Sequence, residues 1–227
     1  MPRAVSRIPL PLKLAYTAFC VVHVVLNWQA YGALNFLWFC DIAVLTLLVA
    51  LWCESSLLAS IAAVEILLPM MLWGVDLAGR IALGHYIFGF AGYMFDRRVP
   101  VQIRILSSFH LWVPVVLLRT LQRLGYDRRA MGIQSVFSAV LLVVCRLVSS
   151  PPPSHYLHEC VNINWVYGPA DSGPQTYFPP VIYLGMMMVL YPVLIYLPTH
   201  MVLSALFTCR SAKSGEGAVA RVHAAHV

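Results

Sequence analysis

The chain has 227 residues, of which 60% are hydrophobic and 11% are charged, and its formal net charge is +6. Soluble domains carry about 25% charged residues, so this composition excludes a soluble enzyme, a nucleic-acid-binding domain and a disordered tail protein. Together with a mean hydropathy of +0.78, it predicts an all-α, polytopic membrane helix bundle.

Six segments are long and apolar enough to cross the hydrocarbon core as helices, which takes about 20 residues each. We expect one helical-bundle domain over residues 14–208, after a cytoplasmic N-terminus (1–13) and before a flexible cytoplasmic tail (209–227). Residues 80–96 are glycine-rich and short, so we expect an interfacial or re-entrant segment there, with a seventh span as the alternative. The six spans cover residues 14–31, 34–53, 56–77, 102–120, 130–149 and 180–208.

Lysine and arginine residues predict the orientation of these spans. They precede the first span, join the fourth to the fifth and follow the sixth, and an even number of spans places all three groups on one side. The positive-inside rule makes that side cytoplasmic. The loop over residues 150–179 contains no lysine or arginine and is expected outside, whereas the arginines between residues 80 and 104 oppose this arrangement.

The first span carries a polar face. Tyr16, Cys20, His23 and Asn27 recur at intervals of three and four residues, which places them on one side of a helix. On their own, His23 and Asn27 favour a polar seam that fixes helix packing over a catalytic or ligand-binding role.

Ionisable side chains inside the spans are expected to face the bundle interior, because each costs about 2.5–3.5 kcal/mol at mid-bilayer. The third span carries Glu65 and Asp76, which share a helical face but lie about 16 Å apart along the axis. This separation suits two steps of a proton path, or two separate structural pairs with Arg80 and a histidine, and we favour the structural interpretation. The whole set comprises His23, Asp41, Glu65, His110 and His200, with Asp76 near a span end.

The second span places a thiol directly before a carboxylate, in the sequence Asn35-Phe-Leu-Trp-Phe-Cys40-Asp41. A thiol becomes a useful nucleophile as the thiolate, so it needs a nearby base that takes its proton. His110, in the fourth span, is the best-placed candidate by its depth in the membrane. Taken alone, a membrane cysteine and a membrane histidine are more often ordinary packing residues.

The second span has a cysteine early on, followed by an acidic residue, and a histidine begins a later apolar run. This pattern resembles that of a group of six- or seven-span membrane proteins. The group includes the bacterial YwaF-like integral membrane proteins and the eukaryotic transmembrane acyltransferases and lipid hydrolases related to androgen-induced-gene proteins. The resemblance covers roughly residues 34–118 and implies that Cys40 is a nucleophile on lipid acyl groups, with His110 as its base. The family pattern has Pro and His before the cysteine, where this chain has Phe36 and Trp38.

Over the whole chain, three further stretches look like uncharacterised bacterial membrane-associated proteins. That likeness implies a location in the bacterial inner membrane but no mechanism. The stretches are Gly92-Tyr-Met-Phe-Asp-Arg-Arg98, Gly125-Tyr-Asp-Arg-Arg129 and Asn162-Ile-Asn-Trp-Val-Tyr-Gly-Pro169.

The outer loop over residues 150–179 is too elaborate for a simple connector, and loops of this length are usually functional or disordered. Its aromatic and amide residues favour an ordered structure. We expect Trp165 to anchor the membrane interface, and Asn162 and Asn164 to cap the mouth of the bundle or to bind a polar headgroup.

The remaining histidines give weaker signals. His155, His158 and Cys160 resemble half of a metal site, but zinc sites usually show two well-spaced ligand pairs, so we expect a solvated loop, no metal site and no cofactor. In the last span His200 follows Pro198 closely, and we favour a place at the inner membrane interface over one in the bundle interior.

Three functions compete. The first is an intramembrane enzyme acting on a lipid or fatty-acyl substrate, with a thioester on Cys40, proton transfer by His110, and Asp41 or Asn35 orienting the pair. Ranked nearly equal is a non-catalytic accessory or assembly protein, and behind both stands a small proton-coupled transporter built on the ionisable residues of the spans. The expected partners are membrane lipids, together with a second copy of the chain or another membrane protein, and no nucleic acid.

Overall fold

The computed structural model describes residues 7–153, 161–170 and 172–207. Within these residues the chain is all-helical, as the sequence predicts, and its only extended pairing is an isolated bridge between Ser150 and Val161. The α-helices are α1 (Leu10–Tyr31), α2 (Phe39–Cys53), α3 (Ser56–Leu83), α4 (Val101–Leu106), α5 (Phe109–Leu124), α6 (Ala130–Val148) and α7 (Pro180–Leu190). The other helices are the 3-10 helices η1 (Ala33–Leu37), η2 (Gly92–Phe95) and η3 (Ile163–Trp165) and the π-helix η4 (Tyr191–Tyr196), which continues α7 toward Phe207.

The prediction of six spans needs a correction at the second one. Gly32 ends α1 with a φ of 78°, η1 follows, and α2 begins only after the extended residue Trp38. The 15 residues of α2 rise about 22 Å at 1.5 Å per residue, which is short for a bilayer. Five helices are long and apolar enough to cross a membrane: Leu10–Tyr31, Ser56–Leu83, Val101–Leu124, Ala130–Val148 and Pro180–Phe207.

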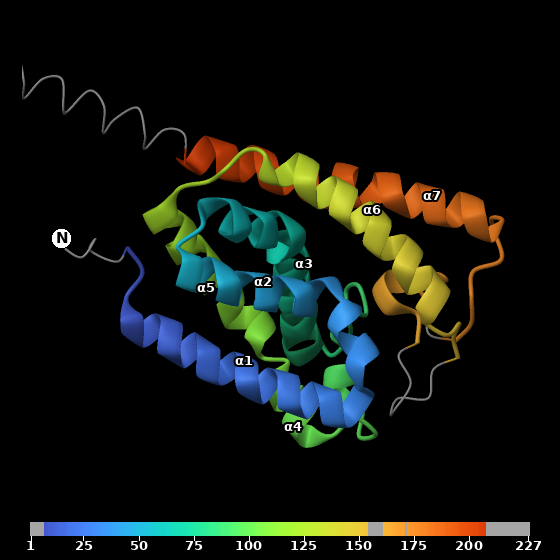
Figure 1. Cartoon of the computed structure of the whole chain (residues 1–227). Coiled ribbons are helices and arrows are strands. Elements are labelled where there is room, and N and C mark those ends of the chain that lie inside the picture. Colours follow the sequence, from blue (N-terminus) through green and yellow to red (C-terminus); the bar gives the residue numbers. More distant parts are fainter. Residues whose placement is uncertain (1–6, 154–160, 171, 208–227) are drawn as a thin grey trace, which may run out of the picture.

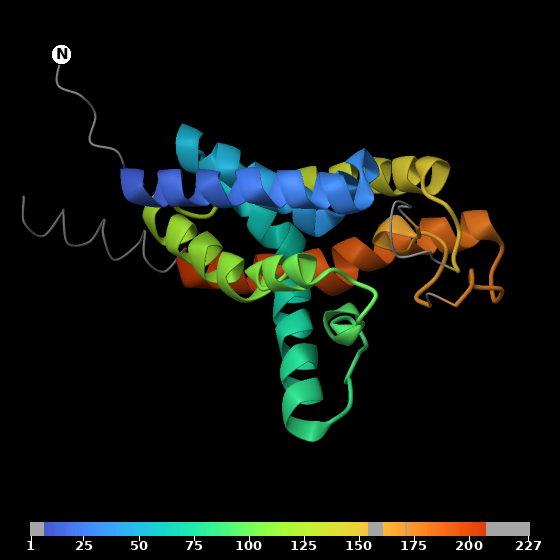
Figure 2. The same cartoon turned by 90° about the horizontal axis from the view of Figure 1, so that it is seen from below.

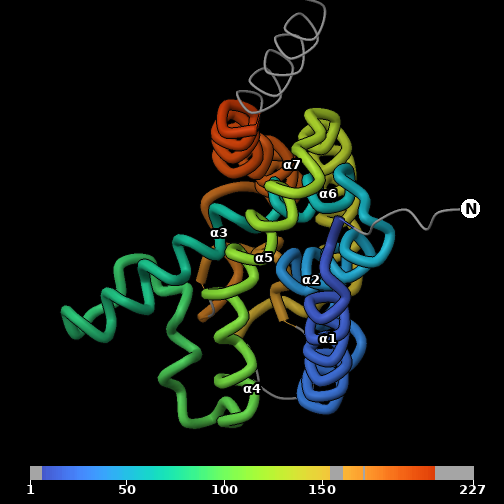
Figure 3. Tube along the Cα trace, turned by 90° about the vertical axis from the view of Figure 1, so that its left-hand side faces the viewer, coloured from blue at the N-terminus to red at the C-terminus, as the bar shows by residue number. Residues whose placement is uncertain are grey.

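The third helix is longer than the predicted span 56–77. It continues to Leu83 and stops at Gly84, whose φ of 79° is left-handed. Figures 2 and 3 show its C-terminal part, with residues 84–100, projecting from the bundle that the other long helices form. Within residues 84–100 the longest helix is η2, with four residues, so this segment folds back without crossing a membrane.

Asp76 holds the returning segment against α3. Its buried carboxylate accepts four main-chain N–H groups, three at Oδ1 over 2.7–3.1 Å and one at Oδ2 at 2.8 Å. These amides belong to Ile87, Phe88, Gly89 and Ala91. Asp76 therefore has a structural role, but the expected partners were wrong. Arg80 instead donates to the Gly84 carbonyl and lies over the rings of Tyr86 and Phe95.

The core forms where the N-terminal half of α3 packs against α2, α5 and α6. Ala59, Ala62 and Ala63 of α3 are fully buried, and such small residues let helix backbones approach closely. Along one side of this core, α6 and α7 lie side by side (Figures 1 and 3). The first turn of α1 and the end of the last helix lie at the same end of the molecule (Figure 1).

Glu54 joins the start of α1 to the turn between α2 and α3. It is the left-handed residue that ends α2, with a φ of 50°. Its carboxylate accepts the Lys13 ammonium at 2.8 Å and the main-chain N–H groups of Arg7 and Ile8 at 2.9 and 3.3 Å. This contact fixes the N-terminal end of α1 on the bundle.

The substitution Glu54→Gln is expected to lower the free energy of unfolding by about 1 kcal/mol or more, because it removes the charge of a partly buried ion pair and one of the two oxygens that accept the Arg7 and Ile8 amides. Denaturant titration in detergent micelles measures this change. Asp127→Asn, at the exposed pair with Arg129, serves as the matched control and should change stability less. An equal loss in both variants would contradict the anchoring role of Glu54.

Candidate functional site

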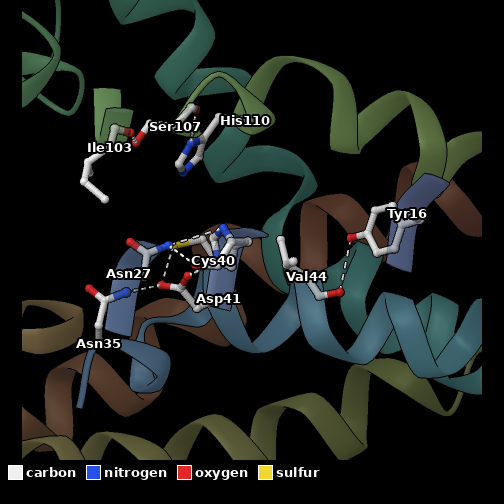
Figure 4. A network of polar contacts seen from close by, with 10 residues as sticks. Tyr16, Asn27, Asn35, Cys40, Asp41, Val44, Ile103, Ser107 and His110 are labelled. Atoms are coloured by element: carbon white, nitrogen blue, oxygen red, sulfur yellow. Dashed lines mark hydrogen bonds and ion pairs between the residues drawn. The ribbon is translucent and has the colours of Figure 1, made fainter. Parts of the chain in front are cut away.

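Five polar side chains gather where α1 ends and α2 begins, and Figure 4 shows Asn27, Asn35, Cys40 and Asp41 of this group. All are buried except the half-buried Cys40. The predicted polar face of α1 is confirmed, because Tyr16, Cys20, His23 and Asn27 are among its buried residues. The turn at Gly32 and η1 brings the chain back so that α2 starts beside this face. The cluster comprises His23 and Asn27 of α1, Asn35 of η1, and Cys40 and Asp41 of α2.

The central contact of this cluster joins His23 to Asp41. The Nε2 atom of His23 lies 2.5 Å from Oδ1 of Asp41, and the two side chains are 1% and 6% exposed. The amide nitrogen of Asn27 lies 3.3 Å from Nδ1 of His23 and donates to the main-chain oxygen of the same residue at 3.0 Å. This arrangement assigns the ring proton to Nε2, which donates to Asp41, while Nδ1 accepts from Asn27.

The second oxygen of Asp41 faces the thiol. Cys40 donates to Oδ2 over 3.8 Å, and the Asn35 amide donates to the same atom over 3.3 Å. Asp41 also lies in the first turn of α2, where the helix dipole favours a negative charge. The group within reach of the thiol proton is therefore the Asp41 carboxylate.

His110 is not the hydrogen-bond partner of Cys40 that the sequence predicted. Its Nδ1 lies 2.8 Å from the Ser107 carbonyl, and within the described residues no hydrogen bond joins it to Cys40. The ring stacks on Trp73 at 4.7 Å and on Phe109 at 4.1 Å. Figure 4 shows it directed toward the side of Cys40 and Asp41 without reaching them. Since Nδ1 donates to a carbonyl, Nε2 is left as an acceptor.

Aromatic rings lie between and around the two parts of the site, which are the cluster of His23, Asp41 and Cys40 and the His110 ring. Phe109 packs edge-on against His23 at 5.2 Å as well as against His110. Tyr93, from η2, lies beside Ser107 and Trp73, and burial raises its pKa, so it remains a neutral phenol. These groups converge at breaks in the helices, namely the start of α2, the segment 84–100 and the α4–α5 junction.

Comparisons with protein-family models, with curated proteins and with solved structures give no match. The likeness to YwaF-like proteins and to the androgen-induced-gene lipid hydrolases stays a prediction. In the described part of the chain, no group of three or more His, Cys, Asp and Glu side chains is arranged to hold a metal ion. The half-site of His155, His158 and Cys160 lies outside the described residues.

The loop between α6 and α7 contributes directly to the start of α2 through Asn164. Its side-chain oxygen accepts the Phe39 N–H at 3.0 Å, and its nitrogen donates to the Leu37 carbonyl at 2.8 Å. The side chain thus caps α2 one residue before Cys40. This role at the start of α2 differs from the predicted cap on the bundle mouth or polar-headgroup site, which stays a prediction.

The other predicted loop residues have local roles. The side chain of Asn162 bridges the Gly168 carbonyl and the Tyr167 N–H, each at 2.8 Å, which holds the loop turn together. The half-buried Trp165 ring stacks on Phe90 at 5.4 Å and meets Trp38 edge-on at 6.3 Å. Their amide and indole groups therefore serve to order the loop.

His200 lies away from the cluster, at the α5–α6 turn. Its Nδ1 is 2.7 Å from the hydroxyl of Tyr126. Burial, the largest cause, raises the pKa of Tyr126 to about 12, so the phenol keeps its proton and donates it to the histidine. The expected place of His200 at the inner membrane interface stays a prediction.

Glu65 lies in the interior, but its neighbours were missed in the sequence. It faces Gln134 of α6, and the same amide lies beside the hydroxyl of Tyr196. Gln134 is a lone amide in an apolar span, which is the signal that could have drawn attention to it. Tyr93 and Trp73, beside His110, carried no comparable signal because aromatic residues are common throughout the chain.

Proposed function

We propose that this protein is an intramembrane enzyme that transfers or hydrolyses lipid acyl groups, with Cys40 as its nucleophile. The observation that carries the proposal is the contact between the Cys40 thiol and an Asp41 carboxylate that His23 and Asn35 hold in place. In this proposal Asp41, and not the predicted His110, is the base that takes the thiol proton. A half-buried nucleophile beside an oriented base is an arrangement suited to covalent catalysis.

In the first step Asp41 takes the thiol proton of Cys40, and the sulfur attacks the carbonyl carbon of a lipid ester. The carbon–oxygen bond breaks, the alcohol leaves with the proton from Asp41, and the acyl group remains as a thioester. His23 stabilises the carboxylate through the Nε2 contact at 2.5 Å.

In the second step a hydroxyl of water or of an acceptor lipid attacks the thioester. Its proton goes to Nε2 of His110, the acceptor atom left by the bond to Ser107. The carbon–sulfur bond breaks, and the proton on His110 then passes to the thiolate, which restores both groups. The apolar rings of Phe109 and Trp73 around His110 keep bulk water out, which strengthens polar interactions in the site.

The membrane setting supplies the substrate and fixes the orientation in this proposal. Lipids reach the site laterally from the bilayer. Lys13 lies in the first turn of α1, Arg123 in the last turn of α5 and Arg129 at the N-cap of α6. By the positive-inside rule such basic residues favour the cytoplasmic side, and the proposal keeps the predicted location in the bacterial inner membrane with cytoplasmic N- and C-termini.

A clickable fatty-acyl ester tests the mechanism in the purified protein. We expect a hydroxylamine-sensitive acyl label on the wild type, loss of the label in Cys40→Ala, and labelling slowed about 100-fold or more in Asp41→Asn. Cys53→Ala removes an exposed thiol at the far end of α2 and should label like the wild type. Equal labelling of Cys40→Ala and the wild type would overturn the proposal.

An accessory or assembly role remains the second candidate, because a specific observation favours it. The polar atoms of His23, Asn27 and Asp41 are paired with one another or with Asn35, as a seam that only joins α1 to α2 requires. A stoichiometric partner that co-purifies with the wild type and with Cys40→Ala alike, without any acyl label, would support this role.

A further inference from the structure

A second polar cluster lies in the core, where α3, α6 and η4 meet. Glu65, Gln134 and Tyr196 are 2%, 0% and 0% exposed. Both carboxylate oxygens of Glu65, both polar atoms of the Gln134 side chain and the Tyr196 hydroxyl are buried without a hydrogen bond to any described residue. More than about 90% of buried polar groups in proteins have such a partner. Five unpaired atoms at one place therefore point to an occupant.

Oxygen acceptors outnumber donors in this cluster. Gln134 lies beside Glu65 and Tyr196, but the pairs do not reach hydrogen-bond geometry. The neighbouring Ser138 lies beside the Tyr196 hydroxyl. It gives its proton to the Ser135 carbonyl at 3.0 Å, so its oxygen counts as an acceptor. An excess of carboxylate, amide and hydroxyl oxygens is the ligand set of a small hard cation.

The backbone adds a further acceptor. Pro69 lies inside α3 and has no N–H, so the main-chain carbonyl of Glu65, four residues earlier, lacks its helical partner. On the opposite wall, η4 is a π-helix that contains Pro192 and ends at Tyr196. Single π-turns inside α-helices occur frequently at functional sites.

No cationic side chain balances Glu65. Within the described residues it makes no ion pair, and no titratable side chain of α5 or α6 contacts it. The titratable groups whose charges reach it are Cys40 of α2 and Tyr196 of η4, and neither can carry a positive charge. An ionised carboxylate that is buried without a balancing positive charge lowers the stability of the fold by several kcal/mol.

We propose that Glu65, Gln134 and Tyr196 form a buried binding site for one small cation, a proton or a sodium ion, which neutralises Glu65. The site lies between α3, α6 and η4, whereas His110 belongs to α5 and stacks on Trp73 further along α3. A proton and a sodium ion would both be bound by the oxygen atoms of this site. The experiment below distinguishes the two.

Infrared difference spectroscopy of the full chain in detergent, in sodium-free choline buffer, tests the proposal. We expect the carbonyl band of a protonated, buried carboxyl group in the wild type and its loss in Glu65→Gln. Adding sodium chloride should convert this band to a carboxylate band if sodium binds, and should leave it unchanged if the proton is the sole occupant. Asp96→Asn, at a half-buried carboxylate that pairs with the exposed Arg98, should keep both the band and its response.

Two milder variants keep the test valid if Glu65→Gln does not fold. Gln134→Leu and Tyr196→Phe each remove one polar neighbour of Glu65 and are expected to shift the carbonyl band without abolishing it. The proposal is overturned if Glu65→Gln retains the wild-type band and the wild-type sodium response. It is equally overturned if the wild type shows an ionised Glu65 in sodium-free buffer.

Discussion

Asp76→Ala is expected to lower the free energy of unfolding by about 4 kcal/mol. The carboxylate accepts four main-chain N–H groups between Ile87 and Ala91. Hydrogen bonds to a charged group contribute about 1.5–3 kcal/mol each, and losses within one network are not additive. The loss leaves buried amides without an acceptor in a segment that has little helix of its own.

Hydrogen–deuterium exchange in detergent, combined with denaturant titration, measures this effect. The amides of Ile87, Phe88, Gly89 and Ala91 should lose their protection in Asp76→Ala, while amides of α6 keep theirs until global unfolding. Asp96→Ala, which removes a carboxylate of the same segment that pairs with Arg98, is the control and should leave the pattern unchanged. Protection retained in Asp76→Ala would show that the segment is held by its aromatic contacts instead.

The second large effect is expected at the His23–Asp41 pair. His23→Leu leaves Asp41 buried at 4% exposure without its closest partner, and breaking a buried pair from one side costs about 3–5 kcal/mol. Asp41→Leu leaves the His23 Nε2–H without an acceptor and should also destabilise the fold. The double variant removes both groups, so its loss should be clearly smaller than the sum of the single losses.

A double-mutant cycle followed by denaturant titration gives this coupling directly. Asn27→Leu provides the control, because Asn27 contacts His23 but not Asp41; it should cost less than either member of the pair. Additive losses for His23→Leu and Asp41→Leu would contradict the contact at 2.5 Å. Comparing stability with acyl labelling in Asp41→Asn then separates a structural role for the pair from a chemical one.

Much of the helical architecture could be predicted because apolar length and helical spacing are local properties of the sequence. The face formed by Tyr16, Cys20, His23 and Asn27 is buried as expected, and α6 matches its predicted span within one residue. The predicted spans 14–31 and 34–53 correctly separate at Gly32. The second span was wrong because hydropathy does not register the extended Trp38, which divides residues 34–53 into η1 and the shorter α2.

The residues of the candidate site could be predicted from the sequence, but the contacts between them could be predicted only in part. Cys40 and Asp41 are adjacent in sequence, and the histidine that meets Asp41 lies on the polar face of α1. Depth in the membrane favoured His110 instead, because depth carries no information on which helix faces which. The contact of Asn164 with Phe39 spans 125 residues, and no local pattern encodes such a pairing.

The Asn164 cap joins the loop between α6 and α7 to the start of α2. Two of the three hydrogen bonds of its side chain hold the last residue of η1 and the first residue of α2, and the third goes to Cys145. Cys40 is the next residue along the chain after Phe39. A displacement of this loop has to break these bonds, and the first turn of α2 then loses its cap. The position of the loop is thereby coupled to the helix turn that carries Cys40 and Asp41, across a single side chain.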